Sequence, residues 1–371
     1  MKILMVSPQA YPPYVGGVET HLYDISRFLV KKGHHVEIYS TDPSGKLSPS
    51  TVINGVRMAR FFSWAPWGLY HFSPKLFASL KNAQACVIHA HDYRSFPMLA
   101  AALAKAKNKT PLVITLHLGA SKVGRMPYLV YNPIFGNLIF HRADKIVVVS
   151  KIEVEYFRQL KKMRNKIIHI PNGIDLDEVS KYKRKVVTNE SKIRILYAGR
   201  LERKKGISYL LKAFNKVVAH HDVDLWIVGD GPLKSELIDI IKKQKMNGKV
   251  HLRFNVSRDE LYGLYARAHI FVLLSQFEAH SIALTEAMAF GLVPVATNVG
   301  GNAYLVNDGK DGFLVKYPPS INEISQILVR LINDSSMRKE MSKCATENSQ
   351  RFNIENCVSK LENLYQCVLR M

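Results

Sequence analysis

The feature that most constrains the fold is a repeated alternation between short aliphatic runs and longer segments with helical periodicity. KILMVS at residues 2–7 is followed by VETHLYDISRFLVKKG at 18–33 and then by HHVEIYS at 34–40. Such runs, separated by amphipathic segments, predict parallel strands joined by crossover helices. The same rhythm starts again with RILYAG at 194–199 and continues to HIFVLLS at 269–275. We therefore predict an α/β protein made of two Rossmann-like, doubly wound halves.

The break between the two halves lies in a charged stretch. LDEVSKYKRKVVTNESK at 176–192 shows no apolar period and carries Asn and Ser near its end, as is typical of a linker. The 371 residues are enough for two domains, since domains usually have about 100–200 residues. We predict a first domain over 1–178, a second over 193–350, and a C-terminal helix over 351–371 that crosses back to the first. A ligand is expected at the carboxyl ends of the strands, in the cleft between the halves.

Composition narrows the class of protein and its partners. The chain has 52 Lys and Arg against 30 Asp and Glu, a net charge of +22, so nucleic acid, an anionic membrane surface and phosphate-bearing small molecules are all open as partners. No apolar run approaches the roughly 20 residues that cross a bilayer. The four cysteines show no CxxC spacing, and the first residues do not have the pattern of a signal peptide. We expect a cytoplasmic protein without a membrane-spanning segment.

Gly16 and Gly17 mark the first place where an anion could bind. They lie between the first predicted strand and an amphipathic helix, where unpaired backbone N–H groups and the positive end of the helix dipole face the strand's end. A tight turn from strand to helix explains the same two glycines. The fingerprint GxGxxG is absent, so a nicotinamide dinucleotide site is not supported.

Two glutamates in FEAHSIALTEAMAFG, at 277–291, raise a question of chemistry. Glu278 precedes a predicted helix over about 281–290, and Glu286 lies within it. A helical path would separate the two by about 12 Å, whereas carboxylates that share acid and base work on one glycosidic bond lie about 5–9.5 Å apart. The spacing instead suits hydroxyl groups at the two ends of an extended ligand. A helix glutamate favoured by the dipole and a surface loop glutamate are the plainer alternatives.

Several motifs occur in a fixed order: HAHD at 89–92, IPNGID at 170–175, ILYAGRLERKKGISYLL at 195–211, LWIVGDGP at 225–232, the segment with the two glutamates, and NDGKDGFLV at 307–315. Through this ordered set the chain resembles nucleotide-sugar glycosyltransferases of the GT-B fold, specifically the retaining glycosyltransferase family 4. The resemblance covers nearly the whole chain and is strongest over 196–315. It implies two Rossmann-like domains that face each other across a cleft, with a UDP- or GDP-sugar as donor.

The resemblance also implies roles for five side chains. Arg200 and Lys205 would neutralise the departing diphosphate, and Glu278 would contact the transferred sugar. His117 would lie beside that sugar at its 6-hydroxyl, and Glu286 would bind the ribose hydroxyls. The two cations lie between a predicted strand and a helix, where they can face a diphosphate. A solvated basic turn is the alternative for the cations, and a structural histidine is the alternative for His117.

The start of the helix over 281–290 offers further contacts. The peptide N–H groups of His280, Ser281, Ile282 and Ala283 are candidates for binding sugar and phosphate oxygens. This chain has EAHS where the family often has an EGFG-like run, so the detailed sugar contacts differ here. His89 and His91 in HAHD lack further ligands, so no zinc is expected. The resemblance implies catalysis without a metal ion or other cofactor, with basic residues in the metal's place.

Two segments, 58–80 and 124–142, mix aromatic with basic residues. This mixture suits a membrane interface or a lipid-linked acceptor, and it equally suits a core beneath a long loop. The predicted function is transfer of a hexose-type sugar to a lipid-linked or saccharide acceptor, by a protein that rests on the cytoplasmic face of a membrane. A nucleotide-sugar epimerase of the same fold and a basic nucleic-acid-binding protein are the alternatives, although the second shows no base-stacking motif.

Overall fold

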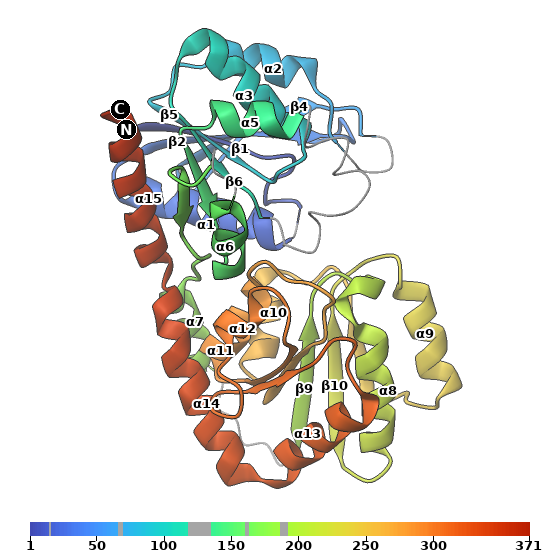
Figure 1. Ribbon diagram of the computed structural model, residues 1–371. Helices are drawn as coiled ribbons and strands as arrows, with labels where there is room; N and C mark the ends of the chain where they lie inside the picture. Colours follow the sequence, from blue (N-terminus) through green and yellow to red (C-terminus); the bar gives the residue numbers. More distant parts are fainter. Residues whose placement is uncertain (15, 66–69, 118–134, 160–162, 186–191) are drawn as a thin grey trace. The chain divides into compact units, whose positions relative to one another are not determined.

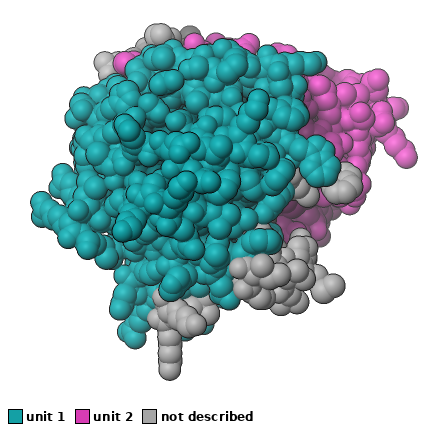
Figure 2. Space-filling view, turned by 90° about the horizontal axis from the view of Figure 1, so that it is seen from above, with its two compact units in different colours: residues 1–173, 354–371 teal, residues 174–353 magenta. Residues whose placement is uncertain are grey.

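The computed structural model describes the chain except for residues 15, 66–69, 118–134, 160–162 and 186–191 (Figure 1). The described residues form two compact units, which are coloured separately in Figure 2. Unit 1 comprises Met1–Gly173 and Ile354–Met371, and unit 2 comprises Ile174–Asn353. Each unit has its own sheet with helices packed on it, which confirms the predicted α/β class with two Rossmann-like domains.

Unit 1 is built on an eight-stranded sheet with the order β3-β4-β2-β1-β5-β6-β7-β8. The strands are β1 (Lys2–Val6), β2 (His35–Asp42), β3 (Ser50–Ile53), β4 (Val56–Phe62), β5 (Val87–His91), β6 (Leu112–Thr115), β7 (Lys145–Val148) and β8 (Ile167–His169). The edge strand β3 pairs antiparallel with β4, and the other pairings are parallel. The strand order reverses between β1 and β5. In doubly wound sheets, ligands bind outside the carboxyl ends of the strands at this reversal.

Helices pack on both faces of the unit 1 sheet (Figure 1). They are α1 (Gly17–Lys31), α2 (Pro74–Lys81), α3 (Phe96–Asn108), α5 (Asn137–Arg142), α6 (Lys151–Arg158) and α15 (Ile354–Leu369). Successive side chains of a strand point to opposite faces. Ile3 and Met5 of β1 therefore meet α1 and α15 in one core, while Leu4 and Val6 meet α2, α3, α5 and α6 in the other.

Unit 2 is built on a six-stranded parallel sheet with the order β11-β10-β9-β12-β13-β14. The strands are β9 (Ile193–Ala198), β10 (Val223–Val228), β11 (Val250–Arg253), β12 (Ile270–Leu273), β13 (Val293–Thr297) and β14 (Phe313–Val315). The helices are α7 (Leu176–Lys185), α8 (Ile207–Val218), α9 (Lys234–Lys243), α10 (Arg258–Tyr265), α11 (Ile282–Phe290), α12 (Asn302–Leu305), α13 (Ile321–Asn333) and α14 (Ser335–Ser349). Counted along the chain, the strand order is 3-2-1-4-5-6, which is the order of the Rossmann fold. Its reversal lies between β9 and β12.

The linker predicted over 176–192 is wrong for its first ten residues, because these form helix α7. Val179 is buried in the unit 2 core, and Leu176 and Tyr182 pack against that core. These three residues are spaced three apart, so they lie on one face of a helix. The polar residues between them, Asp177, Glu178, Ser180 and Lys181, hide this short apolar stripe in the sequence. The boundary between the units lies just before α7, between Gly173 and Ile174.

The C-terminal helix α15 belongs to unit 1 and packs against α1 (Figure 1). Cys357, Leu361 and Tyr365 are buried in the core that α1 shares with the sheet. Glu362 adds a polar contact at the surface, because its Oε1 lies 2.7 Å from Nε2 of His34. The first unit thus includes residues from both ends of the chain.

The aromatic segment over 58–80 divides between core and surface. Phe61 and Tyr70 pack against the core between α2 and α3, whereas Phe62 and Trp64 are 61% and 67% exposed. Trp67 lies outside the described residues, as do residues 124–134 of the second segment. Within the rest of that second segment, Phe140 is buried. Among the helices that the structure describes, none has both the length and the apolar character that a bilayer crossing requires.

Candidate functional site

Polar residues follow β9 and β12, the two strands at which the order of the unit 2 sheet reverses. Lys205 follows β9, and Ser275 and Glu278 follow β12. The Lys205 ammonium donates to Glu278 Oε1 at 2.7 Å, and the Ser275 hydroxyl donates to the same oxygen at 2.6 Å. The structure thus brings two of the predicted catalytic residues together as an ion pair.

The ion pair between Lys205 and Glu278 is largely shielded from solvent. The side chains of Glu278 and Lys205 are 10% and 22% exposed. A carboxylate removed from water to this degree is costly unless it is paired and hydrogen-bonded. Lys205 and Ser275 meet that need and hold the Glu278 carboxylate in one orientation.

Three glycines hold the backbone of the Glu278 loop close to its neighbours. A Cβ at Gly206 would lie 1.9 Å from the carbonyl oxygen of Leu274, and a Cβ at Gly300 would lie 1.9 Å from that of Glu278. The Gly301 N–H donates to the same Glu278 carbonyl at 2.9 Å. Gly206 and Gly300 also have positive φ values of +71° and +52°, which glycine adopts without strain. The glycines of KKG and VGG therefore set the position of the loop that carries Glu278.

Arg200 lies at the surface of unit 2, with its side chain 69% exposed. Its Nε donates to Glu202 Oε1 at 3.0 Å, and Lys204 pairs with the other Glu202 oxygen at 2.6 Å. Burial alone would raise the pKa of Glu202, but the hydrogen bond from Lys204 and the charge of Arg200 lower it. The Tyr197 hydroxyl donates to the Arg200 carbonyl at 2.8 Å and so holds its backbone. The guanidinium is therefore accessible, and its ion pair with Glu202 is one that a diphosphate could replace.

Helix α11 begins at Ile282, four residues after Glu278. The Ser281 hydroxyl caps the helix by accepting from the Leu284 N–H, at 3.3 Å. No hydrogen bond from the N–H of Ile282 or Ala283 occurs among the described residues. The His280 ring lies 3.4 Å from the Thr285 hydroxyl. Of the predicted N–H donors, those of Ile282 and Ala283 are thus available to oxygen atoms.

Glu286 lies one turn further along α11 and is 6% exposed. The Tyr262 hydroxyl of α10 donates to Glu286 Oε1 at 2.9 Å. The Tyr262 ring packs edge-on against Tyr182 and Phe290, and this packing keeps the hydroxyl in place. The Tyr265 side chain also hydrogen-bonds Glu286, so tyrosines hold this carboxylate in a defined direction.

The predicted histidine of unit 1, His117, is half-buried and lies against a cluster of buried histidines. It follows β6 and has a φ of +48°, a left-handed conformation that is uncommon for residues other than glycine. Its Nε2 lies 3.1 Å from Nδ1 of His91, and the two rings stack with their centroids 5.4 Å apart. His89 lies next to His91, with ring centroids 4.1 Å apart, and its two nitrogens contact the hydroxyls of Tyr365 and Thr115 at 2.6 and 2.7 Å. The strands β5 and β6 thus carry this cluster at their carboxyl ends.

Burial keeps three of these histidines, His21, His89 and His91, neutral. Loss of hydration lowers the pKa of His89 to about 3 and that of His21, which lies on α1, to about 4. The pKa of His91 is also lowered well below its ordinary value, first by burial and then by its histidine neighbours. At neutral pH each of these three rings therefore has one N–H and one bare nitrogen.

The anion site predicted at Gly16 and Gly17 carries an acidic side chain of the protein. Helix α1 begins at Gly17, and the Glu19 carboxylate folds back so closely that a Cβ on Gly16 would lie 2.2 Å from Glu19 Oε2. A negative charge is favourable at a helix N-terminus. A phosphate that bound here would have to displace Glu19.

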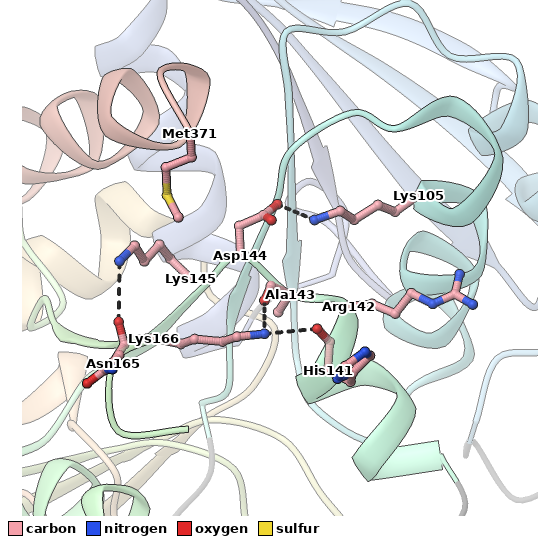
Figure 3. A pocket seen from close by; sticks show the side chains of 9 residues that line it. All are labelled: Lys105, His141, Arg142, Ala143, Asp144, Lys145, Asn165, Lys166 and Met371. Carbon is pink, nitrogen blue, oxygen red and sulfur yellow. Dashed lines mark hydrogen bonds and ion pairs between the residues drawn. The ribbon is translucent and has the colours of Figure 1, made fainter. Parts of the chain in front are cut away.

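A basic cavity of about 550 Å³ also lies in unit 1, at the amino ends of β7 and β8 (Figure 3). Its lysines are already engaged. Lys166 donates to the carbonyl oxygens of Phe140, His141 and Ala143 at 2.8–3.1 Å, and Lys105 pairs with Asp144. The cavity lies at the sheet edge opposite to the carboxyl ends, and we do not assign it to the functional site.

Sequence reasoning missed three hydroxyl groups that hold the predicted residues. Ser275 has a weak local signal, since it is a polar residue directly after a buried strand. Tyr262 and Tyr365 have none, because they lie on amphipathic helices where an aromatic residue is expected to be part of the core. Their contacts join residues 24 and 276 positions apart in the sequence.

The sequence of the chain is similar to those of known glycosyltransferases. A family model described as Glycosyltransferase Family 4 matches residues 15–178, and one described as Glycosyl transferases group 1 matches residues 178–348. N-acetyl-alpha-D-glucosaminyl L-malate synthase of Bacillus anthracis is 25% identical over 374 residues, which cover 96% of this chain and 96% of the relative. Phosphatidyl-myo-inositol mannosyltransferase of Mycobacterium tuberculosis is 25% identical over 385 residues, which cover 99% and 97% of the two chains.

The fold of the chain is also similar to that of a solved structure. The crystal structure of HepE from Anabaena in complex with UDP-glucose matches with a TM-score of 0.80 at 21% identity, covering 99% of this chain and 100% of HepE. At this identity the likeness concerns the fold, and it confirms the predicted GT-B architecture. The two family models are adjacent and together cover residues 15–348. The chain therefore belongs to the family 4 glycosyltransferases, enzymes that use nucleotide sugars as donors.

Proposed function

We propose that the protein transfers a hexose-type sugar, with retention of anomeric configuration, from a UDP- or GDP-sugar to a lipid-linked or saccharide acceptor. The observation that carries this proposal is the ion pair of Lys205 with the buried Glu278, close in sequence to the N-terminus of α11. A cation, a carboxylate and N–H donors are the groups that a sugar diphosphate requires. The relatives are named for an N-acetylglucosaminyl and a mannosyl group, and HepE was crystallised with UDP-glucose, all of which favour a hexose donor.

In this proposal each predicted residue keeps a separate task. Lys205 and Arg200 stabilise the charge that develops on the diphosphate as the sugar bond breaks. Glu278 binds the sugar, and Glu286, which Tyr262 holds in place, binds the ribose. His117 of unit 1 contributes a contact to the donor sugar.

The peptide groups at the start of α11 complete the donor site. The N–H groups of Ile282 and Ala283 bind phosphate or sugar oxygens, and His280 and Ser281 shape the turn before them. Gly16 and Gly17 contribute to phosphate binding only if Glu19 moves aside.

The proposed chemistry exchanges one bond of the sugar for another on the same face. The bond from the anomeric carbon to the diphosphate oxygen breaks, and a bond to the acceptor hydroxyl oxygen forms. The proton of that hydroxyl passes to the departing phosphate oxygen. Glu278 is a poor nucleophile in this setting, because Lys205 and Ser275 both donate to its Oε1. This supports displacement assisted by the leaving phosphate. An NMR assay of the product's anomeric configuration tests the proposed retention.

We also propose that the reaction needs no metal ion. Arg200 and Lys205 supply two positive charges at the place where a diphosphate would bind. Transfer measured in excess EDTA should match transfer in added Mg²⁺, and a strict requirement for the metal would overturn this part of the proposal.

For the acceptor, we propose a lipid-linked molecule reached from a cytoplasmic membrane surface. The support is the pair of exposed aromatic side chains Phe62 and Trp64 on a chain with a net charge of +22. Liposomes with anionic lipid should sediment the wild-type protein, and the double change Phe62→Ala and Trp64→Ala should weaken this binding. Leu369→Ala, which removes another exposed apolar side chain, is the control. Binding that is absent or unaffected by the double change would refute the membrane contact.

The donor is identified by screening UDP-, GDP- and ADP-sugars for thermal stabilisation, because a ligand that binds the folded state raises its melting temperature. The best donor is then assayed for turnover with and without acceptors. Transfer that requires an acceptor and is abolished by Glu278→Ala in a folded protein supports the proposal. Conversion of the donor alone would indicate an epimerase instead. Normal turnover of the Glu278→Ala variant would refute the assigned site.

A further inference from the structure

The histidine cluster around His117 leaves three buried polar atoms without a hydrogen-bond partner. They are His21 Nδ1, His91 Nε2 and Asn172 Oδ1. The three residues are only 5%, 1% and 5% exposed, and all of them line one small cavity in unit 1. A buried polar atom without a partner is costly. Three such atoms around one cavity indicate that the cavity has a polar occupant.

The size of the cavity fits one water molecule. It offers about 10 Å³ to the centre of a water, which is close to the least space that holds one. A buried water typically makes about three hydrogen bonds to groups that would otherwise lack a partner. The number of unpaired atoms therefore equals the number of hydrogen bonds that one buried water makes.

The hydrogen-bond partners of this water determine which histidine nitrogens carry a proton. His21 also hydrogen-bonds the backbone of Gly173. Because its Nδ1 has no partner, the nitrogen that donates to this backbone is Nε2, and the neutral ring keeps Nδ1 as an acceptor. Asn172 Oδ1 is an acceptor as well. One water can donate to these two atoms and no more, so the third atom, His91 Nε2, must carry a proton and donate to the water.

The state of His91 then determines that of His117. A neutral His91 with its proton on Nε2 has a bare Nδ1, and this Nδ1 lies 3.1 Å from His117 Nε2. The proton in that hydrogen bond must therefore come from His117 Nε2.

We propose that a water in this cavity holds His91, and through it His117, as the Nε2–H tautomer, so that the His117 ring meets the donor sugar in one fixed tautomer. The inference rests on the proposed function for its last step, the contact with the sugar. His91 is a positioning residue in this arrangement. The His89 ring packs against the His91 ring and limits its movement, because Tyr365 and Thr115 hold the His89 ring in place.

The tautomers are measured directly by NMR of the full-length protein labelled with ¹⁵N-histidine, with signals assigned by single histidine variants. His91 and His117 should both show a protonated Nε2 and a bare Nδ1 at pH 7.5. A His117 protonated on Nδ1 would overturn the proposal. So would a high-resolution crystal structure in which the cavity holds no water.

Two variants of His91 separate positioning from packing. In His91→Asn the side-chain oxygen takes the place of Nδ1 and can still accept from His117, whereas His91→Leu removes the acceptor. With the best donor, His91→Leu should lower kcat/KM about 10-fold, the effect of one lost hydrogen bond, and His91→Asn should recover most of that loss. Equal losses in both variants would mean that His91 only fills space.

The two proposals can fail separately. If no nucleotide sugar is turned over by the wild-type protein, the proposed function is wrong, but the NMR signals still report the tautomers. If transfer occurs and His117 is protonated on Nδ1, the proposed function stands and the tautomer assignment is wrong.

Discussion

Lys205 and Glu278 are 73 positions apart in the sequence, and a hydrogen bond of 2.7 Å joins the ammonium of one to the carboxylate of the other. Lys205→Met keeps the aliphatic stem and removes the charge, so a mostly buried carboxylate loses its cation. We expect the free energy of unfolding to fall by about 1–3 kcal/mol and kcat/KM to fall about 100-fold. Urea unfolding and initial rates of transfer measure the two effects.

The neighbouring Lys204→Met is the matched control for that change. Lys204 is exposed and pairs with Glu202 at the surface, so its loss should change stability by no more than about 0.5 kcal/mol. If Lys205→Met transfers sugar like the wild type, Lys205 has no part in the site.

Gly300 and Gly309 allow backbone strain to be separated from steric clash. Both have positive φ, +52° and +72°, but a Cβ at Gly300 would lie 1.9 Å from the Glu278 carbonyl oxygen, whereas a Cβ at Gly309 would meet no atom within 4 Å. Gly309→Ala should cost about 1–2 kcal/mol from its conformation alone and leave transfer intact. Gly300→Ala should cost more and abolish transfer, because the Glu278 loop must move. Unfolding curves and transfer rates that were equal for the two variants would contradict this account.

Tyr262→Phe removes the hydroxyl that donates to Glu286 at 2.9 Å. Without it the carboxylate is held less firmly, so the Kd for UDP or GDP should rise about 2–10-fold, the effect of one hydrogen bond. Isothermal titration calorimetry measures this change. Tyr182→Phe removes a hydroxyl that bonds Asp259 at the surface of the same unit and should leave the Kd unchanged. Unchanged affinity in both variants would show that Glu286 does not need Tyr262.

Glu153 on α6 makes the stability of unit 1 depend on pH. Its Oε2 accepts from the backbone N–H groups of Val149 and Ser150 and from the Ser150 hydroxyl, at 3.1–3.2 Å, while its Oε1 is buried without a partner. Burial raises the pKa of this carboxyl from 4.5 to about 7. Between these two values the folded state holds a proton that the unfolded state has lost. The stabilisation is therefore complete below pH 4.5 and is lost as the pH rises through 7.

The titration of Glu153 changes the free energy of unfolding by up to about 3 kcal/mol, because its pKa is about 7 in the folded state and 4.5 in the unfolded state. Glu153→Gln cannot titrate, so the free energy of unfolding should fall less between pH 5 and pH 8 than in the wild type. Glu155→Gln, at an exposed position of the same helix, should keep the wild-type slope. Parallel slopes for wild type and Glu153→Gln would show that another group is responsible.

The alternation of strands and helices was predictable because each element carries its own period, and so were the strand ends at which Lys205, Glu278 and His117 lie. Helix α7 was not predicted, because its stripe of Leu176, Val179 and Tyr182 is short and set among charges. The partners of the site residues could not be predicted for a different reason. Tyr262 reaches Glu286 and Tyr365 reaches His89 through tertiary packing, which no local pattern in the sequence records.

The membership of α15 in unit 1 has a consequence for how the chain folds during its synthesis. The buried residues of α15, among them Cys357, Leu361 and Tyr365, complete a core whose other residues come from the first 170 positions, so all of unit 2 is translated before this core can close. Unit 2 is continuous and can fold as soon as it leaves the ribosome. The part of the protein that is made first is thus completed last, and until α15 arrives the face of the sheet that it covers, with the ring of His89, remains open to solvent and to chaperones.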